Sequence, residues 1–328
     1  MHELAVTRLR NGSAAQILVV TSPCPEITEE IAQLLGHKGE PWVWHIRQCL
    51  DGHTEGLDAR FYLARVAGRL VSNVTVFQNG SLGSVGHVFT QPEFRRLGLA
   101  RLLLDAALSE FATGGGRALV LTTGFQSMPW RLYESFGFTG TCPEQSYGGM
   151  AKFLDGADWQ TVLAGPPGEI RRADWRHYLG AQVLFGAPGP VQLRSILLPC
   201  IGARVVEEEF IRLKLRQQHG EAVDCWVIEG QSSAILGCAL LGAHPIWGAR
   251  GARKALDLYA VAPAAAAVPD LLAAILETCQ GPVECYCDGC AEQQMDLLSR
   301  SGFRQEARFA GALRFADALT DLVVMVRE

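Results

Sequence analysis

The sequence contains no run of about 20 apolar residues, the length that a membrane-spanning helix needs, and its 328 residues include no basic tract. A formal net charge of -5 argues against nucleic acid as the binding partner. The first 20 residues show no apolar segment closed by a small-residue cleavage site, so we expect no secretory signal. These absences predict a cytoplasmic globular protein with neither a membrane nor a nucleic-acid partner.

A disulfide framework is not expected either, because such frameworks belong to short secreted domains. The ten cysteines are therefore predicted to be reduced thiols. Cys285, Cys287 and Cys290 lie close together, but no second cysteine pair or histidine follows at zinc-finger spacing. We interpret them as structural cysteines and predict no metal site.

The length predicts one large or two ordinary domains, and the order of elements in the first half favours a mixed sheet. Three β-rich segments form an antiparallel meander, with a tight hairpin at Ala67-Gly68. An amphipathic helix, a buried strand and a second helix follow. The expected strands are 16–21, 61–66, 69–79, 84–90 and 117–123, and the expected helices are 25–36, 41–50, 97–113 and 127–138.

The same order of elements returns in the second half, which indicates two copies of one fold. Periodicity lapses between the halves, where Gly and Pro cluster. We predict an α/β (α+β) protein of two tandem domains, residues 1–155 and 165–328, each a mostly antiparallel sheet flanked by helices. The repeated elements are strands at 224–230, 234–242, 254–263 and 282–288, and helices at 268–279 and 291–303.

The junction after residue 90 is where the chemistry is expected. A strand that enters a helix at a glycine presents free backbone N–H groups at the positive end of the helix dipole. Small residues at Gly98 and Ala100 let a phosphate approach the backbone, and Arg95, Arg96 and Arg101 add positive charge. The pattern indicates a pyrophosphate site. The alternative is a structural role, in which the same residues are only a basic helix start with a glycine needed for packing.

This motif, together with a second motif one strand later, resembles the motifs of a known family. "VFTQPEFRRLGLA" (88–100), followed one strand later by "WRLYESFGF" (130–138), resembles the two signature motifs of the GNAT superfamily of acyl-CoA-dependent N-acyltransferases. The resemblance implies acetyl-CoA as the acyl donor, without a metal. It also implies that Tyr133 protonates the departing thiolate. The implied cofactor contacts are Val88, Phe89, Thr90, Arg95, Arg96, Leu97, Gly98, Leu99, Ala100, Arg101 and Gln126.

The sequence offers several candidates for the general base. Relatives often carry a carboxylate or imidazole at the positions of Ser84 or Gly86, and neither residue can serve. His87 is the nearest candidate, but simple alternation puts it on the opposite face from both. A β-bulge, which this strand commonly has in the family, would turn it inward. Weaker alternatives for the base are His45, His53 and Glu55; Trp42 and Trp44 either line an acceptor pocket or pack in the core.

The second half lacks the same determinants. Arg95 aligns with Ala266, Gly98 with Pro269 and Tyr133 with Leu298. The resemblance there is to a degenerate copy, so we predict one acyl-CoA site per chain. The predicted activity is acetyl transfer to a primary amine by direct attack in a ternary complex. The alternatives are a non-catalytic acyl-CoA-binding regulator, or transfer to a carrier-protein thiol or a protein N-terminus.

Overall fold

The computed structural model describes all residues except 142–146, 249 and 316–317. The chain divides into two compact units, one of Met1–Thr139 with Ala151–Asp158 and the other of Gly140–Met150 with Trp159–Glu328. An 8-stranded sheet and a 7-stranded sheet, both mostly antiparallel, are each flanked by helices. The predicted fold class, with two mixed sheets, is confirmed.

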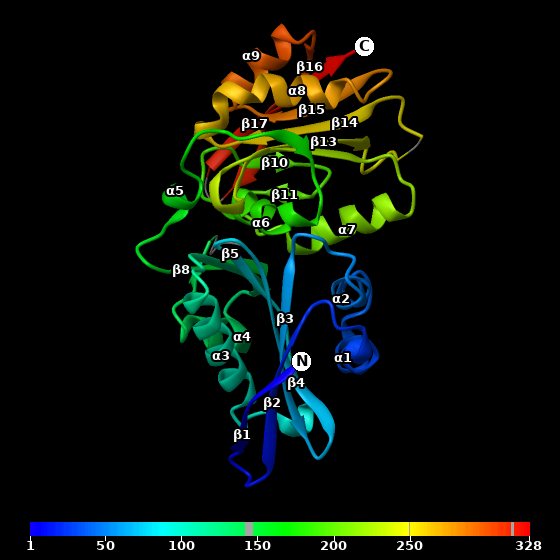
Figure 1. The fold of residues 1–328 in the computed structure, drawn as a ribbon. Helices are drawn as coiled ribbons and strands as arrows, with labels where there is room; N and C mark the ends of the chain where they lie inside the picture. Colours follow the sequence, from blue (N-terminus) through cyan, green and yellow to red (C-terminus); the bar gives the residue numbers. More distant parts are fainter. Residues whose placement is uncertain (142–146, 249, 316–317) are drawn as a thin grey trace. The chain divides into compact units, whose positions relative to one another are not determined.

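The first sheet has the strand order β1-β2-β3-β4-β5-β6-β8-β7. Ala67 (φ 48°) and Gly68 (φ 79°) both adopt positive φ between β3 and β4, as a two-residue hairpin loop requires. The helix α3 packs against β3, β4 and β5, while α1 and α2 lie on the opposite face (Figure 1). The elements are β1 (His2–Arg8), β2 (Ala14–Thr21), η1 (Pro25–Ile27), α1 (Thr28–Leu35), η2 (Gly36–Lys38), α2 (Trp42–Leu50), β3 (Asp58–Val66), β4 (Arg69–Asn79), β5 (Leu82–Thr90), η3 (Pro92–Phe94), α3 (Leu99–Thr113), β6 (Ala118–Gly124), α4 (Met128–Glu134), β7 (Thr139–Gly140) and β8 (Tyr147–Phe153).

The second sheet repeats this topology. Its order is β9-β12-β13-β14-β15-β17-β16, which matches β2-β3-β4-β5-β6-β8-β7 strand for strand. Parallel pairing also occurs at the same place in both sheets, between β5 and β6 and between β14 and β15. The elements are α5 (Trp159–Val162), β9 (Ile170–Arg172), η4 (Trp175–His177), α6 (Tyr178–Gly186), β10 (Leu193–Ser195), β11 (Cys200–Ile201), α7 (Glu207–Gln218), β12 (Asp224–Glu229), η5 (Gln231–Ser233), β13 (Ile235–Ala243), β14 (Lys254–Ala260), η6 (Ala262–Ala267), α8 (Val268–Leu276), β15 (Val283–Asp288), α9 (Glu292–Arg300), β16 (Arg304–Phe315) and β17 (Ala318–Arg327).

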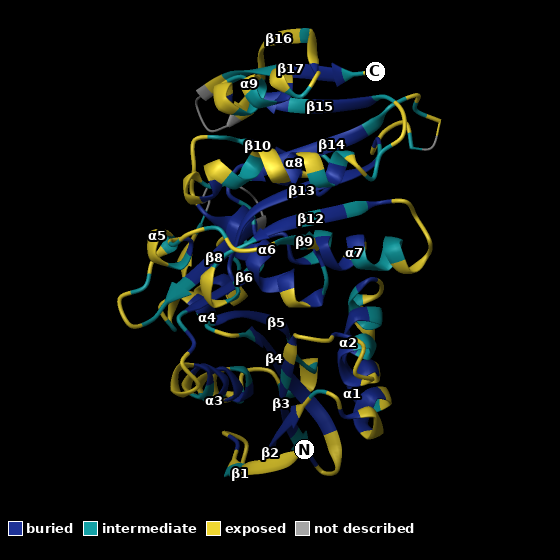
Figure 2. Ribbon diagram, turned by 45° about the horizontal axis from the view of Figure 1, so that its top comes forward, coloured by how far each residue is buried: buried dark blue, intermediate teal, exposed yellow. Residues whose placement is uncertain are grey.

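The core of each unit lies on its central strands. β4 and β13 are buried along nearly their whole length, and the outer side of α3 is exposed (Figure 2). Burial of these apolar side chains is the main favourable contribution to the stability of each unit. Within the described part of the chain, every helix is too short or too polar to span a bilayer.

Candidate active site

The loop between β5 and α3 is shaped by two residues with positive φ. Arg96 has φ 63°, and Gly98, with φ 95°, is the N-cap of α3. Among the described residues, no backbone N–H from 96 to 101 donates to a protein acceptor. Six consecutive N–H groups at the start of a 15-residue helix form the kind of site that binds phosphate oxygens.

The three arginines of the loop are exposed but differ in their contacts. Arg95 Nε donates to the Thr90 carbonyl at 3.0 Å. Arg101 Nη2 donates to Ser135 Oγ at 2.8 Å, and its guanidinium lies 5.0 Å from the centre of the Phe136 ring. Arg96 has no ion pair or hydrogen bond within the described part of the chain. Its side chain therefore keeps all its donors for a ligand, whereas those of Arg95 and Arg101 are partly engaged.

The other predicted loop residues divide by burial. Leu99 is 2% exposed, so its side chain belongs to the core and only its backbone N–H can face a ligand. Leu97 and Ala100 are half-buried. Gln126, with φ 53°, precedes α4, where Ser127 Oγ accepts the Trp130 N–H at 3.3 Å.

The strands β5 and β6 separate beside this loop. Their parallel pairing ends at Ser84 and Val120, so the later part of β5 has an open edge. Gln91 N–H donates to the β4 residue Val71, which shows which alternate residues face β4. By this alternation, the backbone groups of Phe89 face β4, while those of Val88 and Thr90 face the open edge. Of the three predicted strand contacts, Val88 and Thr90 present backbone groups there, and the Thr90 carbonyl already accepts from Arg95.

A β-bulge interrupts β5 at His87. The pairing with β4 shifts between Asn73↔Phe89 and Thr75↔Gly86, and His87 has φ 51°. Asn73 Nδ2 donates to the His87 carbonyl at 2.8 Å and to Thr75 Oγ1 at 2.9 Å. The bulge is therefore fastened by a buried side chain of the neighbouring strand.

The bulge decides which face of the sheet His87 occupies. Ser84 is paired with Phe77 on β4, so the two side chains share a face, and His45 of α2 stacks on the Phe77 ring at 5.0 Å. The His87 ring lies 5.6 Å from Trp42, 5.7 Å from Phe77 and 6.1 Å from His45. His87 thus lies on the α2 face with Ser84, and not on the α3 face that simple alternation gives.

Burial controls the protonation of this histidine. His87 is 4% exposed, and neither ring nitrogen has a hydrogen-bond partner among the described residues. Burial, assisted by the charge of Lys38 and by His45, lowers the pKa of His87 well below its usual value. Burial also lowers the pKa of His45, to about 3. Both rings are neutral at pH 7, and a neutral imidazole is the form that accepts a proton.

Two further polar groups on this face were not predicted from the sequence. Asn73 Oδ1 and Ser84 Oγ are buried, and neither has a partner within the described residues. Buried polar atoms are normally paired, so a ligand or water has acceptors and a donor to bind beside His87. The signal was the run of polar residues Ser72, Asn73 and Thr75 inside an apolar strand.

The remaining candidates are placed as follows. Tyr133 is 5% exposed on α4, with its ring 5.9 Å from that of Phe138. Trp42 and Trp44 are half-buried on α2. His53 and Glu55 lie exposed in the segment between α2 and β3. His87 and Trp42 are thus brought together, while His53 and Glu55 remain at the surface.

Comparison with known proteins agrees with this geometry. Residues 40–153 match the family model of an acetyltransferase (GNAT) domain. This segment is a GNAT acetyltransferase domain. No curated protein gives a significant match to the chain.

Solved structures similar to this chain include several acetyltransferases. An N-acetyltransferase from Staphylococcus aureus Mu50 is 15% identical with a TM-score of 0.41, over 49% of this chain and 97% of its own. A ribosomal-protein-alanine N-acetyltransferase from Brucella melitensis is 14% identical with a TM-score of 0.39, over 49% and 99%. A phosphinothricin acetyltransferase from Sinorhizobium meliloti, in complex with AcCoA, is 14% identical with a TM-score of 0.37, over 48% and 86%.

The second unit differs from the GNAT domain at the corresponding place. The pairing of β13 with β14 runs from Gly237↔Ala260 to Ala243↔Lys254 without a bulge. The short helix η6 replaces the glycine loop, and Leu298, at the position of Tyr133, is fully buried. Cys285 and Cys287 are buried with their sulfur atoms within hydrogen-bond distance, 3.9 Å apart.

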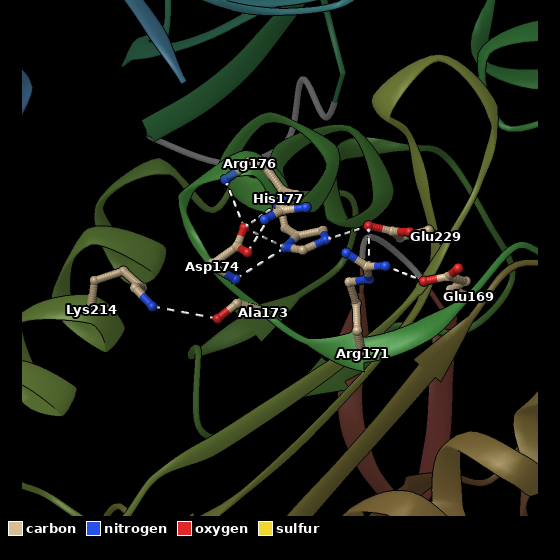
Figure 3. Close-up of polar contacts among 8 residues, drawn as sticks. All are labelled: Glu169, Arg171, Ala173, Asp174, Arg176, His177, Lys214 and Glu229. Atoms are coloured by element: carbon tan, nitrogen blue, oxygen red, sulfur yellow. Dashed lines mark hydrogen bonds and ion pairs between the residues drawn. The ribbon is translucent and has the colours of Figure 1, made fainter. Parts of the chain in front are cut away.

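A separate polar cluster joins β9, β12 and the start of α6 (Figure 3). The Asp174 N–H donates to His177 Nδ1 at 3.0 Å, so Nε2 carries the ring hydrogen and donates to Glu229 Oε1, also at 3.0 Å. Arg171 forms ion pairs with Glu229 at 3.4 Å and with Glu169. His177 and Arg171 both contact Glu229 of β12, so we interpret the cluster as a structural clamp on the edge strand β9.

Proposed function

We propose that residues 1–155 transfer an acetyl group from acetyl-CoA to a primary amine, by direct attack of the amine on the thioester. The observation that carries the proposal is the row of unused N–H groups from 96 to 101 beside an open strand edge. The loop supplies an anion site, and the edge supplies backbone groups for an amide-containing arm. Residues 165–328 form a second domain without this loop.

The loop residues would bind the pyrophosphate of acetyl-CoA. Gly98 and its neighbours offer backbone N–H groups, and Arg96 offers an exposed guanidinium. Val88 and Thr90 would hydrogen-bond the pantetheine amides through their backbone. Leu97, Ala100 and Gln126 would contact the cofactor in the same region and Leu99 would do so through its backbone N–H, while Arg95 and Arg101 would contribute charge and tie the junction to Thr90 and Ser135.

The reacting groups would meet at the bulge. A lysine-like amine, with a pKa of about 10.4, needs roughly 4 to 5 kcal/mol to lose its proton at pH 7. His87, which is neutral at pH 7 and lies next to the half-buried Trp42, would accept that proton; the burial that keeps the ring neutral also makes it a weaker base. Tyr133 would protonate the departing thiolate, whose pKa in solution is about 8.5. Holding both reactants in one orientation supplies much of the remaining acceleration.

The test is turnover of acetyl-CoA, read as free thiol, with a panel of primary amines, a peptide N-terminus and a carrier-protein thiol. Release with an amine supports the proposal, and release with only one of the other two acceptors reassigns the substrate. Binding of acetyl-CoA without release under any acceptor would instead favour a regulator. That alternative is favoured by Ser84 and Gly86, which offer neither a carboxylate nor an imidazole at the strand positions where relatives often carry the base.

His87 itself is tested by pH. Because its pKa is lowered, the ring stays neutral and able to accept a proton down to pH values well below 6.5. The His87→Ala variant should lose most activity at low pH, where the neutral amine is scarcest. An unchanged pH-rate profile would remove His87 from the mechanism and leave the rest of the proposal intact.

A further inference from the structure

The second unit also contains an opening between parallel strands, and this opening leads into a cavity. The pairing of β14 with β15 ends at Leu256 and Cys285, at the position where β5 and β6 separate in the first sheet. The cavity beyond has a volume of about 900 Å³. Its walls come from the end of β14, η6, the start of α8, α9, the segment 187–191 and α5. All of these belong to the second unit.

The cavity is not built for a nucleotide. The η6 wall has the sequence APAAAA and contains neither a glycine nor a cation. The carbonyl of Leu258, on the open edge of β14, already accepts from Gln294 Nε2 at 3.0 Å. An amide-bearing arm would have to displace that side chain. A pyrophosphate would meet neither a glycine nor a cation on the η6 wall.

Most of the wall is apolar. Leu163, Val191, Pro263, Val268 and Leu297 line the space from five different segments. Cavities of roughly 300–1,000 Å³ with apolar walls and a few convergent polar groups are typical of small-molecule sites. The size and the wall composition therefore suit a ligand with a largely apolar body.

One end of the cavity has an unbalanced cation behind it. Arg194 is 2% exposed and forms no ion pair with any carboxylate in the described residues. Its Nη1 donates to the carbonyls of Phe185 and Ala187 at 2.6 and 2.7 Å, and its guanidinium lies 5.0 Å from the centre of the Tyr259 ring. Nη2 has no partner among the described residues. Burying a cation without an anion is costly, so a negative group here is favoured.

The unused Arg194 donor points toward the cavity wall. A Cβ atom placed on Gly189, which lines the cavity, would lie 3.5 Å from Arg194 Nη2 and 3.6 Å from the Tyr259 hydroxyl. The two donors therefore converge beside Gly189. Glu292 and Asp296 of α9 line the cavity together with Arg300, whereas no carboxylate pairs with Arg194 within the described residues, so an anion is favoured beside Arg194.

We propose that this cavity binds a medium-chain aliphatic carboxylic acid, with its carboxylate at the Tyr259 hydroxyl, attracted by the buried Arg194 guanidinium behind Gly189, and its chain along the apolar walls. The site is distinct from the acyl-CoA site of the GNAT domain and does not depend on the proposed activity. It gives the second unit a ligand of its own in place of a nucleotide.

The test is calorimetric titration of the full chain with decanoate and with decanol, in the presence of saturating CoA so that the first site is occupied. We expect one decanoate per chain and binding of decanol at least tenfold weaker. Tyr259→Phe should weaken decanoate several-fold and leave decanol unchanged. Equal binding of the acid and the alcohol, or no binding of decanoate, would overturn the proposal.

Location is tested by a matched pair of substitutions on η6. Ala265 lines the cavity, whereas its exposed neighbour Ala266 does not. Ala265→Trp should abolish decanoate binding, and Ala266→Trp should bind like the wild type. If Ala265→Trp does not fold, the change in tryptophan emission when decanoate displaces water beside Trp159 gives a second measurement, and it should disappear in Trp159→Phe. Binding retained in Ala265→Trp, or the same emission change retained in Trp159→Phe, would place the ligand elsewhere.

Discussion

The substitution Gly98→Ala separates a loss of protein stability from a loss of affinity for CoA. It has φ 95°, and a Cβ built on it would meet no atom within 4 Å. In Gly98→Ala the added methyl therefore collides with nothing in the protein. The remaining cost is backbone strain, roughly 1–2 kcal/mol for a non-glycine residue in this region. The lower entropy of the unfolded chain offsets part of it, about 0.4–1 kcal/mol. The net loss of stability should be about 1 kcal/mol, or about 3 °C in Tm.

Gly98→Ala should reduce the free energy of CoA binding by more than it reduces the stability of the protein. The methyl group would occupy the space through which a phosphate approaches the backbone N–H groups of the loop. A hydrogen bond to a charged group contributes roughly 1.5–3 kcal/mol, so the loss of one weakens CoA roughly 10- to 100-fold. Pantetheine, which has no phosphate, should bind the variant and the wild type equally well.

Gly115 is the matched control. It has φ 79° and also meets nothing within 4 Å, and it lies just beyond the other end of α3, about 22 Å away along the helix. Gly115→Ala should lose similar stability in a thermal melt and keep its affinity for CoA in calorimetry. Equal CoA affinities for the two variants would refute the assignment of the loop as a phosphate site.

Three other substitutions test separate parts of the structure. Tyr133→Phe should slow the chemical step about 100-fold in rapid-quench kinetics while the Kd for CoA stays within a factor of two; a normal rate would exclude the phenol as the acid. Because burial lowers the pKa of His45 to about 3, this histidine should cost stability as pH falls below 6.5, by about 1.4 kcal/mol per pH unit. His45→Phe should flatten that slope in denaturant unfolding, and the same change at exposed His53 should not. His177→Ala leaves the Glu229 carboxylate without its buried partner and should cost about 1–3 kcal/mol in unfolding free energy, with acetyl-CoA turnover unchanged.

Local sequence rules predicted most of the elements. The strand expected at 69–79 is β4 within the same bounds, because its β-branched residues and the Ala67-Gly68 turn act locally. The edge strand β1 was missed because it is exposed and has no apolar periodicity. The closing strands of both sheets were also missed, although the apolar run in β17 is visible in the sequence.

The candidate site also has parts that the sequence predicts and parts that it does not. The loop at Gly98 could be predicted because backbone geometry follows from glycine and helix position. The face of His87 does not follow from alternation alone, because one extra residue in β5 reverses that alternation; only the resemblance to the family suggested the β-bulge that the structure shows. The convergence of Arg194 and Tyr259 is likewise invisible in the sequence, since separate elements of the fold bring these residues together.

One residue and one loop account for the divergence of the two sheets. From the last parallel pair to the following proline, the second unit is one residue shorter than the first, Leu256 to Pro263 against Ser84 to Pro92. Without the extra residue β14 stays regular, and Asp257 accepts hydrogen bonds from the segment 195–197. With the extra residue, β5 loses one pairing position and His87 enters a buried polar cluster. Because the topology is otherwise shared, the bulge and the glycine loop are the features that suit the first sheet to a nucleotide thioester, and their absence leaves the second sheet its apolar cavity.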